Sequence, residues 1–503
     1  MDTRGNPGAP LAAIDMGSNS FRLEIGAMLH GRYRRIDYLK ETVRLGAGLD
    51  ADGMLDEASA QRGLACLRRF AGRLAGFEPG RVRAVATQTL REARNRNAFL
   101  LRAQEALGHA IEVISGREEA RLIYAGVNHM QPAEHSHHTR LVVDIGGRST
   151  ELILGQGRTP GVAESFRVGC VSLSMRYFPE GRITREGFRQ AQVAAGAELE
   201  EALVPFARAN WHQALGSSGT AGAVSQLLQA SGVTDGRITP EGLRWCIERC
   251  LRAGHIERIE MPGLKPERRA VLPGGLAILY TLATHFDIQA LFPAKGALRQ
   301  GVIVDLYERL QGQQAEHPRD MRDASVQELQ QRFQVDTAQA ARVAAVAMAL
   351  FDSAIPDADP ETRRELGWAC ALHELGLMVS HHDHHRHSAY LLAHVDAPGF
   401  SQSQQRRVGE LVLGQRGGLR KVEPQMASET FAWQVLCLRL ALIKCHARGE
   451  VNPRAITLRP RQREAQLGYS AAWAAAHPRT LFLLQEEAAT WTRSGPLRLL
   501  LPA

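Results

Sequence analysis

Two stretches of the chain share one design, in which an apolar run ends in Asp-x-Gly. The first covers residues 11–20 (LAAIDMGSNS) and the second residues 141–151 (LVVDIGGRSTE). In each, the apolar run predicts a buried strand and the glycines predict a tight turn at its end. Glycine lets main-chain amides approach an anion closely, and the aspartate at the strand end can hold a cation that neutralises it. Either stretch alone also fits an ordinary strand and turn, but the pair predicts two similar lobes that face one phosphate-bearing ligand.

The length and composition bound the architecture. At 503 residues the chain exceeds what one hydrophobic core supports, so we expect three or four domains. Its 44% hydrophobic and 23% charged residues are typical of globular proteins. No apolar run reaches the length of a membrane-spanning helix, and the first residues lack the basic-then-apolar order of a secretory signal. We therefore expect a cytoplasmic protein with no integral membrane segment.

The net charge indicates which partners to expect, and the cysteines indicate the state of the thiols. A formal net charge of +8 favours polyanions by raising their local concentration. Nucleic acid is not the expected polyanion, because the chain has no zinc-finger spacing, no aromatic RNA-binding strand motif and no long basic run. The seven cysteines are odd in number and scattered, which predicts reduced and mostly buried thiols. Cys246 and Cys250 lie one helical turn apart without a second pair, which favours core packing over a metal site.

Several side chains near the predicted turns could act on a phosphate. Arg22 follows the first turn and Arg91 follows a later predicted strand; each could clamp a phosphate or be a solvated charge. Ser115 can cap a helix whose first turn carries Glu118 and Glu119. Capping and the helix dipole explain both carboxylates, and the alternative is that one of them points into the cleft as a general base.

A third small-residue turn, Gly216-Ser217-Ser218-Gly219-Thr220, precedes a predicted helix at residues 221–229. Small residues ahead of a helix N-terminus make another anion site. This turn therefore adds a third candidate contact to the same phosphate-bearing ligand.

Five motifs in order resemble one enzyme family. They are DMGSNS at residues 15–20, SGREEAR at 115–121, DIGG with STE at 144–151, GSSGT at 216–220 and GALRQG at 296–301. Together they resemble the exopolyphosphatase / guanosine pentaphosphate phosphohydrolase family, within the superfamily of sugar kinases, actin and heat-shock chaperones. The resemblance runs from about residue 11 to past residue 400.

The resemblance implies an α/β fold with two ribonuclease-H-like lobes around a cleft, then a helical HD-like domain and a small α+β cap. The expected boundaries are a flexible tail at 1–10, lobe I at 11–127, lobe II at 128–310, the helical domain at 318–448 and the cap at 449–503. A polar stretch that ends in Pro318 predicts the linker ahead of the helical domain. The resemblance also implies a homodimer that forms through the helical half.

The resemblance assigns roles to particular residues. Glu119 is the implied base that activates water, and Asp144, Glu151 and Asp15 are the implied carboxylates beside a Mg²⁺ ion. Hydrolysis of a phosphoanhydride needs a positioned water, a base and positive charge on the phosphate oxygens, so these assignments are chemically consistent. The implied phosphate-binding residues are Gly17, Ser18, Asn19, Ser20, Arg22, Arg91, Gly146, Gly147, Ser149, Ser217, Gly219, Thr220 and Arg268.

Two positions depart from the family pattern. Arg148 stands in the second turn, where the family has a third glycine or another small residue, and Gln300 stands where the family commonly has glutamate. The Arg148 side chain could crowd the main-chain cradle or add a cation to it. Either effect would modify activity.

The helical half is rich in histidine. His373-Glu374 resembles the His-Asp pair of metal-dependent phosphohydrolases, and HHDHHRH follows at residues 381–387. A metal site is one interpretation, but no other His and Asp complete a convincing ligand set. By analogy with the family we favour a degenerate domain that guides long substrate. The candidates for its cationic channel are His385, Arg386, Arg416, Arg420 and Lys421.

The leading functional hypothesis is a magnesium-dependent exopolyphosphatase that removes terminal phosphates processively from inorganic polyphosphate. The alternative enzyme hydrolyses guanosine pentaphosphate, and the motifs barely separate the two because both reactions use one cleft. The helical extension and the net positive charge of the chain favour polyphosphate as the substrate. A catalytically impaired protein that binds polyphosphate or alarmone is a third hypothesis, which Arg148 supports and which Glu119, Asp144 and Glu151 oppose.

Overall fold

A computed structural model describes residues 8–29, 31–131, 138–312 and 320–502. Residues 1–7 of the predicted tail lie outside these ranges. The predicted linker lies outside them from residue 313 onward. The chain divides into two compact units, Met1–Arg319 and Asp320–Ala503, each of which has its own core. Among the described residues, no helix combines the length and apolar character needed to cross a membrane.

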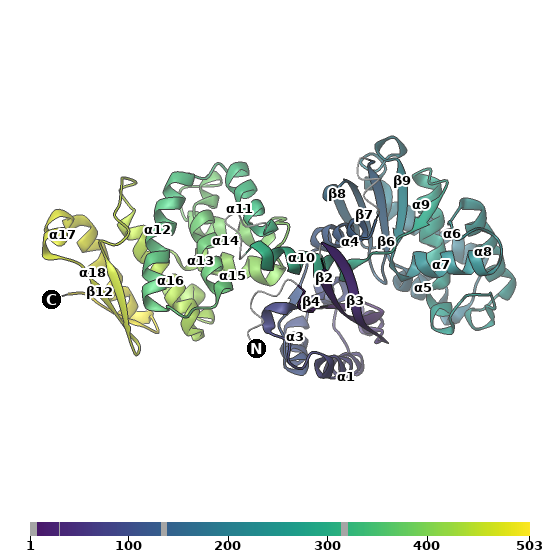
Figure 1. Ribbon diagram of the computed structural model, residues 1–503, viewed down its shortest axis with the longest axis horizontal. Helices are drawn as coiled ribbons and strands as arrows, with labels where there is room; N and C mark the ends of the chain where they lie inside the picture. The colour runs from purple at the N-terminus through teal and green to yellow at the C-terminus, as the bar shows by residue number, and fades with distance from the viewer. Residues whose placement is uncertain (1–7, 30, 132–137, 313–319, 503) are drawn as a thin grey trace. The chain divides into compact units, whose positions relative to one another are not determined.

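The first unit contains two five-stranded sheets of the same topology (Figure 1). Their strand orders are β3-β2-β1-β4-β5 and β8-β7-β6-β9-β10, with three antiparallel strands followed by two parallel ones in each. This repetition confirms the predicted α/β fold with two similar lobes. The strands are β1 (Leu11–Met16), β2 (Ser20–Leu29), β3 (Arg32–Thr42), β4 (Val82–Ala86), β5 (Ile111–Val113), β6 (Arg140–Ile145), β7 (Thr150–Gln156), β8 (Thr159–Phe166), β9 (Gln213–Ser217) and β10 (Leu291–Pro293).

Helices cover both faces of these sheets. The outer face of the first sheet packs on α1 and α3, and the outer face of the second packs on the group from α5 to α9. The helices of the first unit are α1 (Glu57–Arg73), α2 (Gln88–Glu92), α3 (Arg96–Leu107), α4 (Gly116–His129), α5 (Cys170–Tyr177), α6 (Arg185–Leu199), α7 (Ser218–Ala230), α8 (Pro240–Ala253), α9 (Leu272–His285) and α10 (Leu298–Gly312).

Helices α4 and α10 fill the central layer between the two sheets. Alternate residues of β1 divide between cores, so Leu11 and Ala13 join the central core while Ala12 and Ile14 join the outer core of lobe I. The two helices cross at glycines. A Cβ added at Gly301 would lie 1.7 Å from the Leu122 carbonyl oxygen, so only glycine permits this approach. The crossing ties the two lobes together through one packed core.

The second unit is a helical assembly with a three-stranded sheet, which completes the fold expected from the sequence. Its helices are α11 (Met321–Arg332), α12 (Thr337–Ala354), α13 (Pro360–Leu372), α14 (His384–His394), α15 (Gln402–Gly414), α16 (Glu429–Lys444), α17 (Ala471–Ala476) and α18 (Pro478–Ser494), and its strands are β11 (Thr457–Arg461), β12 (Glu464–Gly468) and β13 (Arg498–Leu500). Leu458 and Leu499 of the sheet belong to the same hydrophobic core as the helices. The small sheet therefore packs as part of the helical unit.

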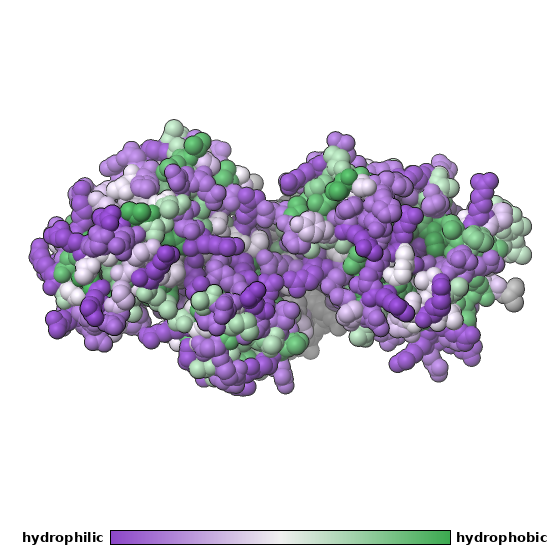
Figure 2. Space-filling model, turned by 180° about the vertical axis from the view of Figure 1, so that it is seen from behind, coloured by the Kyte–Doolittle hydropathy of each residue, from purple (hydrophilic) through white to green (hydrophobic). Residues whose placement is uncertain are grey.

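The surface is mainly hydrophilic, as expected from a globular composition. On the face shown in Figure 2, hydrophilic side chains predominate and the hydrophobic residues form small separate groups.

All seven cysteines are free and buried, which confirms the prediction of reduced thiols. Cys246 and Cys250 both lie in the core of lobe II, as predicted from their helical spacing.

Candidate functional site

The turns that end β1 and β6 meet in the first unit. A Cβ added at Gly147 would lie 3.1 Å from the Cβ of Ser18 and 3.6 Å from the amide nitrogen of Asn19. Asp15 and Asp144, near the ends of the two central strands, line one cavity of about 80 Å³. The structure therefore brings together the two motifs that the sequence analysis paired.

Most of the residues expected at a phosphate site line this cavity. In addition to Asp15 and Asp144, they are Gly17, Ser18, Asn19, Ser20, Arg22, Glu119, Gly146, Gly147, Ser149, Gly219, Thr220 and Arg268. Three expected residues lie behind the lining. Ser217 donates a hydrogen bond to the Gly296 carbonyl oxygen (3.2 Å), Glu151 accepts one from Ser165 (2.8 Å), and Arg91 donates one to Glu119 (2.7 Å).

Side-chain contacts fix the shape of these turns. Thr89 donates to the Ser18 hydroxyl at 2.7 Å, and Thr220 donates to the Ile145 carbonyl oxygen at 2.9 Å. Ser218, at the start of α7, has a φ of 76° and also lines the cavity. A serine in the left-handed region is uncommon and strained, so its residue type gave no signal that it would shape this site.

The register of the strands places a different neighbour beside each aspartate. Asp15 faces Arg22 across β1 and β2, whereas Asp144 faces Glu151 across β6 and β7. Arg22 Nη1 lies 3.1 Å from Asp15 Oδ2, so the carboxylate in lobe I already has a guanidinium partner.

Arg299 also pairs with Asp15, at 3.5 Å, and with the buried Glu24, at 3.1 Å. It lines the same cavity from the first turn of α10. Arg299 was not expected at this site from the sequence, although it lies inside the GALRQG motif at residues 296–301. Its position in that motif was the sequence signal that could have identified it. The contact with Asp15 holds its guanidinium at the cavity.

The carboxylates of lobe II are buried in a less cationic environment than Asp15. Burial is the main cause that raises the pKa of Asp144 to about 6; the charge of Asp15 acts in the same direction and the charge of Arg22 in the opposite one. Burial also raises the pKa of Glu151 well above its usual value, and the charges of Glu119 and Asp144 contribute. A cation placed near Asp144 and Glu151 would relieve this electrostatic cost.

The donor set fits a magnesium ion better than an all-protein metal cage. Within the described residues, no three His, Cys, Asp or Glu side chains come together as a ligand group. Mg²⁺ is usually held by one or two carboxylates, with water and substrate phosphate completing its shell. Asp144, which lines the cavity, and Glu151, its neighbour across the strand pair, match that mode.

The two adjacent glutamates of α4 have different environments. The Ser115 hydroxyl caps the helix by accepting from the Glu118 amide at 3.1 Å. The Glu118 carboxylate binds Arg121 at 2.7 and 2.9 Å within the core, away from the cavity lining. Glu119 lines the cavity. Burial raises the pKa of Glu119, and Arg91, whose Nη1 lies 2.7 Å away, opposes the rise.

Arg148 neither crowds the main-chain cradle nor joins the cavity lining. Its Nε donates to Glu92 Oε2 at 2.9 Å, and its Nη1 donates to the Gly46 carbonyl oxygen at 3.1 Å. Both partners belong to lobe I, so the side chain crosses to the facing lobe. The structure shows neither effect expected from the sequence, because Glu92, 56 positions earlier in the chain, lies within reach of the guanidinium and binds it.

A second cavity of about 420 Å³ adjoins the first. Gly219 and Arg268 line both, and Lys40 and Lys265 add charge to the second. A Cβ at Gly219 would lie 2.0 Å from Arg268 Nη2, so the absence of a side chain there lets the guanidinium lie against the backbone. Burial, together with the charges of Arg268 and Arg22, lowers the pKa of Lys40 to about 8.

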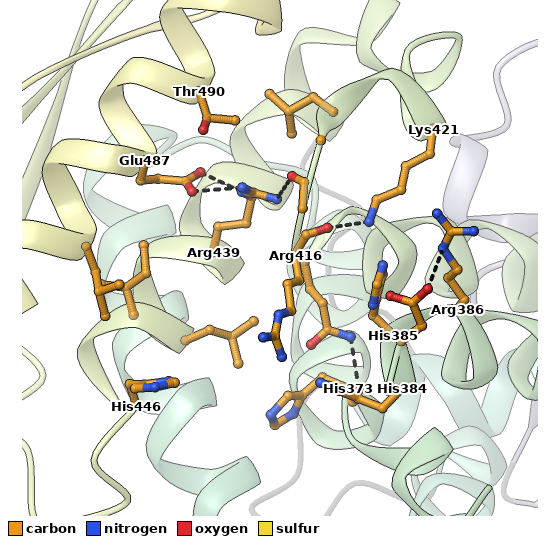
Figure 3. A pocket seen from close by; sticks show the side chains of 18 of the residues that line it. His373, His384, His385, Arg386, Arg416, Lys421, Arg439, His446, Glu487 and Thr490 are labelled. Carbon is orange, nitrogen blue, oxygen red and sulfur yellow. Dashed lines mark hydrogen bonds and ion pairs between the residues drawn. The ribbon is translucent and has the colours of Figure 1, made fainter. Parts of the chain in front are cut away.

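The second unit has its own cavity, of about 1160 Å³ (Figure 3). It is lined by the candidate channel residues Arg386, Arg416, Arg420 and Lys421, together with His385. Burial lowers the pKa of His385 to about 4, so this ring carries no charge at neutral pH. The cationic character of the cavity therefore comes from its arginines and Lys421.

The His373-Glu374 pair lines the same cavity without forming a metal site. His373 Nδ1 donates to the Cys370 carbonyl oxygen at 2.8 Å, and Glu374 is paired with Arg448. In the part of the chain that the structure describes, the histidine-rich segment contributes to no group of three metal ligands.

Two lobes that present glycine-rich turns and buried carboxylates to one small cavity define a class of enzymes that bind substrate phosphate between the lobes. The chain belongs to the Ppx/GppA phosphatase family. Residues 28–310 match that family, and residues 321–488 match Ppx/GppA phosphatase, domain III. The family match confirms the resemblance seen in the motifs and identifies the chain as a phosphatase.

Individual relatives agree with this assignment. A guanosine-5′-triphosphate,3′-diphosphate pyrophosphatase from Photobacterium profundum is 35% identical over 495 residues, covering 97% of this chain and 98% of the relative. A crystal structure of an exopolyphosphatase-like protein is 25% identical with a TM-score of 0.55, covering 61% of this chain and all of that one. An exopolyphosphatase from Cytophaga hutchinsonii shares the fold at 23% identity and a TM-score of 0.53, covering 60% of this chain and 98% of that one.

Proposed function

We propose that the protein hydrolyses the terminal 5′-phosphoanhydride of guanosine 5′-triphosphate 3′-diphosphate, releasing phosphate and guanosine tetraphosphate. The observation that carries this proposal is the similarity to the Photobacterium pyrophosphatase, which extends over both units of the chain. The similarities to the solved structures of an exopolyphosphatase-like protein and of an exopolyphosphatase cover about three fifths of the chain. The comparison thus favours the alternative over the polyphosphate preference drawn from composition.

The two adjoining cavities of the first unit support a branched substrate. The first, of about 80 Å³, suits one terminal phosphate, and the second, of about 420 Å³, has Lys40, Lys265 and Arg268 in its lining. Guanosine pentaphosphate carries phosphates on both sides of its ribose. We place the 5′ terminus among the glycine turns and the 3′-diphosphate in the second cavity. A linear polyphosphate has no such second branch.

In the proposed reaction Glu119 is the general base. Its carboxylate would take a proton from a water molecule as the oxygen of that water attacks the terminal phosphorus. The bond from that phosphorus to the bridging oxygen then breaks, and the remaining phosphates leave with that oxygen. Arg22, Arg268 and the main-chain amides of the turns would stabilise the negative charge that develops on the phosphate oxygens.

We propose Mg²⁺ as the cofactor, since the buried carboxylates of Asp144 and Glu151 lie side by side and a divalent cation would compensate their charge. Asp144 and Glu151 would hold it, with Asp15 facing it from the other lobe. When bound, the ion would neutralise phosphate oxygens during the reaction. Deprotonation of the two lobe II carboxylates would prepare the site for it, because their burial otherwise favours the protonated forms.

Phosphate release from guanosine pentaphosphate and from inorganic polyphosphate, at equal terminal phosphate concentration, tests the choice of substrate. We expect the larger kcat/KM for the nucleotide. A larger value for the polymer would overturn the proposal. Glu119→Gln should abolish hydrolysis of either compound while substrate binding stays largely intact, and unchanged turnover in that variant would contradict the assigned base.

Exopolyphosphatase activity is the second candidate. The large cationic cavity of the second unit, with Arg386, Arg416 and Lys421 in its lining, favours it. Charge reversal at Arg416 separates the candidates. Loss of long-chain polyphosphate hydrolysis with nucleotide hydrolysis retained would support a polymer path through this cavity.

Compartment and assembly complete the proposal. We place the enzyme in the cytoplasm as a homodimer. Seven free, buried cysteines suit a reducing compartment. Sedimentation at micromolar concentration tests the dimer, and a monomeric species throughout would contradict it.

A further inference from the structure

A continuous chain of hydrogen bonds leads from Arg148, in lobe II, to Glu119. We propose that Arg148 is a positioning residue that acts through Glu92 and Gln88 to hold Arg91 against Glu119. The proposal deepens the proposed function, since it rests on Glu119 being the base. Hereafter this set of five residues, Arg148, Glu92, Gln88, Arg91 and Glu119, is called the Arg148 chain.

Each link is short and direct. Arg148 Nε and Nη2 both lie 2.9 Å from Glu92 Oε2. Glu92 Oε1 accepts from Gln88 Nε2 at 2.6 Å. Gln88 Oε1 accepts from Arg91 Nε and Nη2 at 2.9 and 2.6 Å. Arg91 Nη1 then donates to Glu119 Oε2 at 2.7 Å.

The direction of every bond is forced by chemistry. Arginine can only donate and an ionised glutamate can only accept, so Glu92 compels Gln88 to point its amide nitrogen toward it. The carbonyl oxygen of Gln88 is thereby turned to Arg91, which needs an acceptor. If Glu92 lost this role, Gln88 could flip and present its amide hydrogens to a guanidinium that has no acceptor sites.

The chain also explains how Arg91 is held. The Arg91 guanidinium also donates to the Ile114 carbonyl oxygen at 3.0 Å. This bond and the two bonds to Gln88 fix the plane of the guanidinium, and Nη1 also donates to Glu119. Gln88 is 6% exposed and the Arg91 side chain 10%, so these charge-assisted bonds are shielded from water. An arginine fixed in this way holds the carboxylate of Glu119 in one orientation.

Arg148 joins the chain from the other lobe. It follows Gly147, which contacts Ser18 and Asn19 of lobe I, so its reach to Glu92 and to the Gly46 carbonyl oxygen depends on the two turns meeting. Glu92, Gln88, Arg91 and Glu119 all come from α2 and α4. The Arg148 chain therefore links the approach of the two phosphate turns to the orientation of the base.

Steady-state kinetics of Arg148→Ala and Glu92→Gln test the proposal on guanosine pentaphosphate. We expect kcat to fall about tenfold or more in each, with KM within about twofold, because the groups act on the base and do not touch substrate. Glu92→Gln keeps the size of the side chain but cannot accept at both oxygens. The double variant should lose no more than either single variant, since both interrupt the same chain.

A matched control is Arg158→Ala. Arg158 pairs with Glu308 of α10 through an exposed ion pair that joins no member of the Arg148 chain. We expect wild-type kcat and KM for it. Arg148→Lys should recover part of the loss, because an ammonium can reach Glu92 although it cannot also bridge to Gly46. Melting temperatures of all variants within a few degrees of wild type would exclude a general loss of folding.

A readout without turnover separates this proposal from the proposed function. The readout is the rate of hydrogen exchange at the Nε–H group of Arg91, measured by ¹⁵N NMR. The signal is assigned by its loss in Arg91→Lys. The exchange should be faster in Arg148→Ala than in wild type and unchanged in Arg158→Ala. If wild type hydrolyses no phosphoanhydride but the exchange responds, the proposed function fails while Arg148 is still shown to hold Arg91 through the Arg148 chain. If wild type hydrolyses the nucleotide while kcat and exchange are unchanged in Arg148→Ala, or if the losses of Arg148→Ala and Glu92→Gln add, the Arg148 chain is overturned.

Discussion

The two lobes of the first unit have the same backbone topology but opposite charge beside their central aspartates. Both sheets have three antiparallel strands followed by two parallel ones, and both central strands end in Asp-x-Gly. At the equivalent register position Asp15 faces Arg22, whereas Asp144 faces Glu151. A repeated backbone therefore gives two similar turns, but Asp15 has guanidinium partners whereas Asp144 has a second carboxylate beside it. We propose that only the turn of lobe II holds the cation.

The largest expected effect comes from removing the aspartate charge in each lobe separately. Asp144→Asn should lower kcat/KM about a thousandfold, because a buried carboxylate that would hold the metal is lost. Asp15→Asn should cost about tenfold, since Arg22 and Arg299 remain to face phosphate. Phosphate release under saturating Mg²⁺ measures both. Equal losses in the two variants would show that the lobes are equivalent.

A second expectation concerns the neighbour of Asp144. Glu151→Gln should weaken the apparent Mg²⁺ affinity about ten- to a hundredfold and lower the maximal rate less, because Asp144 and the substrate phosphates would still hold the ion. Titration of activity with Mg²⁺ gives the value. Arg22→Gln, at the equivalent position of lobe I, is the matched control and should raise KM with little change in the Mg²⁺ midpoint.

Lys40 extends the comparison to the cavity that adjoins the phosphate turns. Lys40→Met should raise KM for guanosine pentaphosphate about tenfold, because one cation that would face the 3′-diphosphate is lost. Hydrolysis of linear tripolyphosphate should change less than about twofold. An equal effect on both substrates would place Lys40 on a path common to them.

The smallest expected effect is the pH dependence of that contact. The pKa of Lys40 is lowered from its usual value to about 8, so its positive charge is present below pH 8 and is lost as the pH rises through that value. The kcat/KM for guanosine pentaphosphate, which reports the free enzyme, should therefore fall about twofold to fivefold between pH 7 and 9. Lys40→Met should remove this part of the profile, and an unchanged slope in the variant would contradict the assignment.

The strands, the turns and the pairing of the two motifs could be predicted from the sequence because they depend on local pattern. A short apolar run followed by Asp-x-Gly indicates a buried strand and a tight turn from neighbouring residues alone. For this reason the apolar runs that begin at residues 11 and 141 were expected to be strands and are β1 and β6.

The rest of the site depends on contacts between distant parts of the chain. The reach of Arg148 to Glu92 spans 56 positions, and the pairing of Arg299 with Glu24 spans 275. No local pattern encodes such pairs. The residues themselves could not separate Glu118 from Glu119, and only the family resemblance selected Glu119; the packing of α4 turns the first toward Arg121 and the second toward the cavity.

The most direct test of this difference between the lobes is the position of a bound divalent ion. Anomalous diffraction from Glu119→Gln crystals grown with Mn²⁺ and guanosine pentaphosphate would locate it. We predict a peak at coordination distance, about 2.2 Å, from a carboxylate oxygen of Asp144 or Glu151, with the terminal phosphate between the two glycine turns. A peak on Asp15 alone, or a nucleotide bound only in the second unit, would contradict the account.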